Sequence, residues 1–87
     1  MQFKYDDLVK FQQYVNSEEV NGQFVDNYRT LVGTVDQVSD NFYYVKVNDW
    51  FGKHMTLQYH QYVSAATQDD LDKFNEDCRM LCDKNFK

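Results

Sequence analysis

The sequence has no proline and contains few glycines, cysteines and basic residues. Among 87 residues, Gly occurs three times and Cys twice. The lack of proline excludes Pro-rich linkers and docking peptides, and three scattered glycines form no glycine-rich phosphate-binding loop. With 43% hydrophobic and 17% aromatic residues the chain is too apolar to be disordered. We therefore expect one small packed domain spanning residues 1–87.

Positive charge is also scarce, with 9 Lys and Arg against 14 Asp and Glu, for a formal net charge of -5. Nucleic acids and anionic membranes both require a basic surface, so we expect direct binding to neither. No apolar run approaches the roughly 18 residues that a membrane span needs. The first seven residues contain no apolar signal core and turn acidic at once. These features predict a cytoplasmic protein.

The two cysteines and two histidines do not predict a metal site. Cys78 and Cys82 are four residues apart on an expected helix, on its apolar face, where a thiol behaves as a small hydrophobe. This spacing does not orient the pair for a disulfide. His54 and His60 would be about 20 Å apart along one straight strand, too far to share an ion. We expect buried reduced thiols, no metal and no cofactor.

The sequence contains no motif that predicts catalysis. The serines occur in no nucleophile motif, and no pair of carboxylates has the contrasting surroundings that split two pKa values. We therefore expect a non-enzymatic protein. Phe42, Tyr43, Tyr44 and Tyr59 on the expected strands resemble an aromatic surface on which nucleic-acid bases stack. However, only Lys46 and Lys53 accompany them, so the aromatic residues are expected to fill a core.

Residues 30–60 are expected to form three consecutive β-strands, at 31–38, 42–47 and 53–60. β-Branched and aromatic residues dominate these runs, and Ser39-Asp40-Asn41 suits a tight hairpin turn. Gly33 inside the first run predicts a bulge or a sharp bend. The second and third strands alternate, with these apolar residues on their predicted core faces: Tyr43, Val45, Val47, Met55, Leu57 and Tyr59.

Residues 6–20 are expected to form a helix. Apolar side chains recur at helical spacing at Tyr5, Leu8, Phe11 and Val15, and Asn21-Gly22 is typical of a helix end. The alternative makes Asn21-Gly22 the turn of a hairpin, and we favour the helix. Residues 23–29 are then either a short extra strand or the start of the first long one.

The C-terminal segment is expected to form an amphipathic helix that begins at Thr67. Asp70 follows three residues later, so Thr67 and Asp70 form a capping box. Leu71 and Phe74 lie on the apolar face, and Phe74 is expected to share a core with Leu57. The rest of that face is formed by Cys78, Leu81, Cys82 and Asn85. The expected fold class is α+β, with an N-terminal helix, a three- to four-stranded antiparallel sheet, strongly bent and SH3-like, and this C-terminal helix.

The opposite face of this helix is the strongest candidate for an interaction surface. Its carboxylates recur every seven residues, about 10.5 Å along the axis, so that a rigid rod can imitate a row of phosphates. Met80 lies within this acidic stripe of the helix, and Trp50 and Phe51 lie at a turn tip. Exposed apolar groups of this kind are typical of interfaces. The predicted partner-binding residues are Asp69, Asp72, Glu76, Met80, Asp83, Trp50 and Phe51. The alternatives are a solvated helix face and a Trp50 side chain that folds back over the sheet edge.

These patterns favour a small acidic binding protein that blocks the basic site of a nucleic-acid-handling protein partner. Proteins of this size and charge are typical of phage-encoded inhibitors, such as anti-CRISPR or anti-restriction proteins. They act in the host cytosol. One alternative is an assembly module that forms a homodimer through its sheet edge. Another is a small-ligand-binding domain that uses the mixed sheet face.

Overall fold

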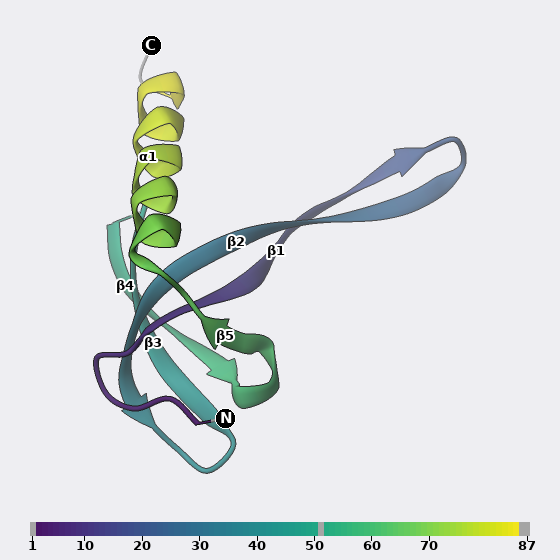
Figure 1. Cartoon of the computed structure of the whole chain (residues 1–87). Helices are drawn as coiled ribbons and strands as arrows, with labels where there is room; N and C mark the ends of the chain where they lie inside the picture. Colours follow the sequence, from purple (N-terminus) through teal and green to yellow (C-terminus); the bar gives the residue numbers. More distant parts are fainter. Residues whose placement is uncertain (1, 51, 86–87) are drawn as a thin grey trace.

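The residues that the structure describes form five β-strands, one short 3-10 helix and one α-helix (Figure 1). The computed structural model describes the backbone of residues 2–50 and 52–85, and the side chains of residues 2–50 and 52–80. In chain order the elements are β1 (Leu8–Val20), β2 (Gln23–Val38), β3 (Phe42–Asp49), β4 (Gly52–Tyr59), η1 (His60–Tyr62), β5 (Val63–Ala65) and α1 (Gln68–Asn85).

The five strands form one antiparallel sheet in the order β4-β3-β2-β1-β5. The α+β class is thus as expected, but the sheet has five strands rather than three or four. Residues 23–29 are the first half of the long strand β2. The additional strand β5 has three residues and pairs only with residues 9–11 of β1. Such a short strand carries too little periodicity to be predicted.

The prediction of an N-terminal helix is wrong, because residues 8–20 form strand β1. Asn21 and Gly22 have φ values of 53° and 80°, which suits the two-residue turn of a hairpin rather than a helix end. Val20 pairs with Gln23 across this turn. The helical spacing of apolar residues was misleading because Val9 and Phe11, two residues apart, are buried on one strand face.

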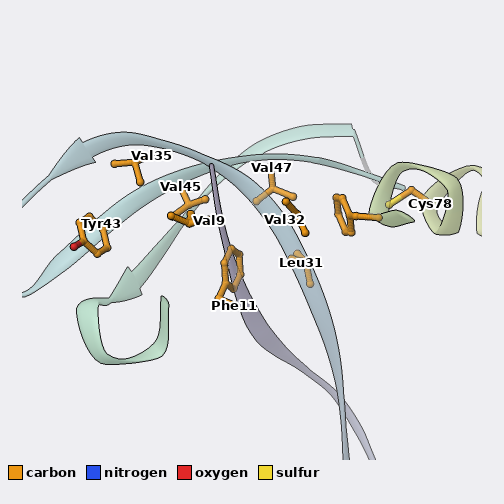
Figure 2. Packing of buried hydrophobic residues seen from close by; sticks show 10 residues of the cluster. Val9, Phe11, Leu31, Val32, Val35, Tyr43, Val45, Val47 and Cys78 are labelled. Atoms are coloured by element: carbon orange, nitrogen blue, oxygen red, sulfur yellow. The ribbon is translucent and has the colours of Figure 1, made fainter. Parts of the chain in front are cut away.

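Most of the core lies on one side of the bent sheet (Figure 2). As predicted, Tyr43, Val45 and Val47 of β3 are fully buried there. Their neighbours on β1 and β2 add to the cluster, and two residues of α1 complete it. Its members are Val9, Phe11, Leu31, Val32, Val35, Tyr43, Val45, Val47, Phe74 and Cys78. Alternate residues of three adjacent strands therefore build one compact apolar layer.

The predicted core face of β4 is wrong. Leu57 is 43% exposed, and Met55 and Tyr59 are exposed as well. The register places Thr56 opposite Val45 and Gln58 opposite Tyr43, so the polar residues of β4 lie on the core side. Because β4 is the edge strand of the sheet, its side chains are not forced into the centre of the core.

Gly33 is not the site of the bulge in β2. The pairing of β2 with β3 shifts between Val35 and Gln37, so Asp36 is the extra residue. Gly33 is instead needed for close packing, since a Cβ atom there would clash with the carbonyl oxygen of Lys46. The absence of a side chain therefore lets β3 approach β2 closely.

Helix α1 packs against the sheet through its predicted apolar face. Phe74 is 5% exposed, Cys78 is buried, and Leu71 is half-buried against the same cluster. Figure 2 shows Cys78 of α1 on the side of the cluster where Leu31 and Val32 lie. Phe74 is thus a core residue as predicted, whereas Leu57 is not. The side chains of Leu81 and Cys82 lie outside the described residues.

Candidate functional site

The predicted acidic stripe lies on the exposed side of α1. Asp69, Asp72, Glu76 and Met80 are all exposed, and Met80 has 61% of its surface open to solvent. At about 100° per residue they lie opposite Phe74, which is buried. The structure therefore brings these four residues together along one side of one helix. The side chain of Asp83, predicted to continue the stripe, lies outside the described residues.

Two cations border the stripe. Helical geometry places Lys73 along one side and Arg79 along the other. Arg79 lines a shallow depression together with Asp72, Asn75 and Glu76. These neighbours reduce the local negative potential, so the outer face of α1 is a mixed surface with an acidic centre.

The capping box that begins α1 is confirmed. The backbone N–H of Asp70 donates to Thr67 Oγ1 at 3.2 Å, and the backbone N–H of Thr67 donates to Asp70 Oδ2 at 2.9 Å. This second bond holds the pKa of the Asp70 carboxyl below its usual value of 3.8, against a smaller opposing effect of desolvation. Lys10, whose Nζ is 3.5 Å from Asp70 Oδ2, adds to the lowering. The N-terminal end of α1 is thereby tied to β1.

The turn between β3 and β4 differs from the outer face of α1 in that its aromatic residue Trp50 is partly buried. Trp50 is half-buried and packs against the core cluster. The guanidinium carbon of Arg29 lies 4.4 Å from the centre of its ring, within the range of a cation–π contact. Trp50 therefore folds back over the sheet, the alternative that was considered from the sequence. Phe51, its predicted companion, lies outside the described residues.

The most prominent surface was missed by the sequence reasoning. Beyond the core, β1 and β2 continue as a two-stranded arm, defined here as residues 12–30, which leads away from the rest of the molecule (Figure 1). All residues of the arm are exposed except Asn27 and Arg29, which are half-buried. Its exposed large apolar residues are Tyr14, Val15, Val20, Phe24, Val25 and Tyr28. The Asn21-Gly22 pair was the one signal in the sequence that could have revealed this arm.

The histidines and the described cysteine have separate surroundings. His54 Nε2 lies 2.7 Å from Oδ2 of the buried Asp49, whereas the His60 ring stacks on Tyr43 with centroids 4.2 Å apart. Cys78 is a buried thiol on α1. In the part of the chain that the structure describes, no three His, Cys, Asp or Glu side chains gather as a metal ion would require. Within the same part, no helix combines the length and apolarity needed to cross a bilayer.

Comparison with known proteins adds no family assignment. No protein-family model, no curated protein and no solved structure matches the chain. Functional inference therefore depends on the exposed surfaces themselves.

Proposed function

We propose that the protein is a non-enzymatic binding protein whose acidic surface occupies a basic site on a protein partner. One observation carries this proposal, namely that Asp69, Asp72, Glu76 and Met80 are all exposed along one side of α1. Like charges on one helix face repel one another and contribute little to folding. An exposed methionine among them adds an apolar contact of the kind found in interfaces.

The supporting geometry is a helix with exposed carboxylates that is anchored to the core through its other face. Phe74 and Cys78 anchor α1 on the core, and the capping box closes its first turn. Asp69 and Glu76 are seven residues apart, about 10.5 Å along the axis. A fixed row of carboxylates can compete with phosphates for lysine and arginine side chains without the entropy loss of ordering a flexible segment. The finer proposal is an inhibitor of a nucleic-acid-handling protein, of the phage-encoded anti-CRISPR or anti-restriction type.

The experiment is a pull-down from host lysate with the parent chain, the double variant Asp72→Lys with Glu76→Lys, and a control. The control, Asp40→Lys with Asp77→Lys, makes the same change in net charge at exposed positions outside the stripe. We expect the parent and the control to retain a basic nucleic-acid-handling protein that is released by added salt. The stripe variant should lose it, because like-charge contacts cost several kcal/mol.

The thermal stability of all three proteins should be nearly equal, since these carboxylates are exposed. Met80→Ala should weaken capture without changing its dependence on salt, because it removes an apolar contact only. Capture of the same protein with equal strength by the stripe variant would contradict the proposal. The outer face of α1 would then be only a solvated surface.

A further inference from the structure

The arm, residues 12–30, is a paired two-stranded element rather than an irregular loop. Ser17 Oγ donates to Asp26 Oδ1 at 2.6 Å, and Asn27 Nδ2 donates to Asn16 Oδ1 at 2.8 Å. Tyr14 and Tyr28 meet edge to face with centroids 5.9 Å apart. Cross-strand pairs of this kind hold both strands in register. The middle of the arm is thus held in register by side-chain contacts.

The tip of the arm combines exposed apolar and acidic side chains. Phe24 is 78% exposed and shares one face of the arm with Glu19, with which it pairs across the two strands. Val20, Val25 and Glu18 are exposed on the other face. The arm therefore presents apolar side chains that the folded monomer leaves uncovered.

A groove of the complementary character lies between α1 and the sheet. It has a volume of about 420 Å³, and its apolar lining comes from Leu8, Val32, Met55 and Leu71. Lys46 and Lys53, both exposed, supply two positive charges. The described residues that line the groove include no carboxylate, although the whole chain carries a net charge of -5. The groove thus suits a ligand that is both apolar and acidic.

We propose that this groove binds the tip of the arm from a second copy of the chain. Phe24 would cover the apolar lining, while Glu19, its cross-strand partner on the same face of the arm, would face Lys46 and Lys53. The charge complementarity of the two surfaces supports this pairing. The arm leads away from the body that carries the groove (Figure 1), so the chain does not fill its own groove.

Two copies that exchange arms would form a closed dimer with two identical arm–groove contacts. If the geometry does not close, the same contact adds copies head to tail. In either case association depends on protein concentration. The inference is independent of the proposed function, because it uses neither the acidic stripe nor a foreign partner.

The experiment measures molar mass by sedimentation and light scattering from micromolar concentrations to about 1 mM. The arm variant carries Glu18→Lys and Glu19→Lys, and the groove variant carries Lys46→Glu and Lys53→Glu. Each variant alone should associate at least about a hundredfold more weakly than the parent, because like charges then meet. An equimolar mixture should associate again, since each arm of one variant matches the groove of the other.

The control variant, Asp40→Lys with Asp77→Lys, changes the charge by the same amount as the arm variant and should associate like the parent. Circular dichroism of every variant checks that it is folded. A parent chain that stays monomeric throughout the concentration range would overturn the inference. So would association that survives both reversals, or a mixture in which association is not restored.

Discussion

Position 33 requires glycine because the neighbouring atoms leave no room for a side chain. A Cβ atom at this position would clash with the carbonyl oxygen of Lys46 and lie 2.9 Å from Val45 Cγ1. Its φ lies outside the left-handed region, unlike those of Gly22 and Gly52. The lack of a side chain, rather than backbone freedom, is therefore what this position requires. Both contacts come from β3, so the constraint acts where β2 and β3 pack most closely.

Gly33→Ala should lower the free energy of unfolding by about 1–3 kcal/mol, the usual cost of overpacking a core. Urea denaturation followed by circular dichroism measures this loss. Gln37→Ala, at an exposed site in the same strand, is the control and should change stability by less than about 0.5 kcal/mol. Equal stability of Gly33→Ala and the parent would mean that β3 can move away without cost.

At the scale of elements, α1 depends on few contacts for its position. Leu71, Phe74 and Cys78 are its described side chains that meet the core cluster, and Asp70 links its first turn to Lys10 of β1. Strand β4 is the contrasting case, because its apolar residues lie outside the core. Substitutions on the buried side of an element should therefore lower stability more than substitutions on its exposed side.

Phe74→Ala should destabilise the protein by about 3–5 kcal/mol, since it empties a buried site between α1 and the sheet. Leu57→Ala removes a side chain that is 43% exposed, so its cost should stay below about 1 kcal/mol. Chemical denaturation of both variants provides the comparison. A larger loss for Leu57→Ala than for Phe74→Ala would show that β4 packs through its other face.

The capping box should make the contribution of Asp70 depend on pH. The Thr67 N–H and Lys10 lower the pKa of Asp70 in the folded protein below 3.8. The charged carboxylate thus favours folding above pH 3.8, and this contribution is lost as the pH falls through the lowered folded pKa. The melting temperature of Asp70→Asn should be lower than that of the parent near neutral pH. The difference should shrink on acidification below pH 3.8.

Melting temperatures measured by circular dichroism at several pH values test this expectation. Asp40→Asn, at an exposed turn position, provides a control for the loss of one carboxylate. A difference between Asp70→Asn and the parent that does not vary with pH would mean that the carboxylate charge contributes nothing.

At the scale of the whole molecule, the arm and the body, meaning the described residues outside the arm, are stabilised by different contacts. The body is held by the core cluster, whereas the arm is held by strand pairing and side-chain hydrogen bonds at its surface. The principal extents of 41, 32 and 21 Å reflect an elongated molecule. A body that buries its own core should fold without the outer part of the arm.

Replacement of residues 14–28 by Asn-Gly should leave the body folded. Gln13 and Arg29 are paired, so a two-residue turn can join them and keep the contact of Arg29 with Trp50. The free energy of unfolding should change by no more than about 1 kcal/mol, because the removed residues make almost no buried contacts. Circular dichroism and denaturation measure the outcome. Loss of the folded structure would show that the arm supports the core.

The sequence by itself determined the features that depend on neighbouring residues. The 39–41 turn, the core face of β3, the Thr67–Asp70 capping box and the buried positions of Phe74 and Cys78 all follow from local patterns. In each case the alternation or spacing of side chains matched one structure only. The same helix pattern also placed Asp69, Asp72, Glu76 and Met80 on the exposed side.

Only the tertiary structure decided the features that depend on distant partners. Residues 8–20 satisfy a helical pattern as well as a strand, and pairing with β2 selects the strand. The apolar face of β4 is exposed because the register with β3 places Thr56, not Leu57, opposite Val45. Trp50 is half-buried because the fold packs it against the core cluster and brings Arg29 to its ring. These outcomes depend on contacts between residues far apart in the chain, which local periodicity does not encode.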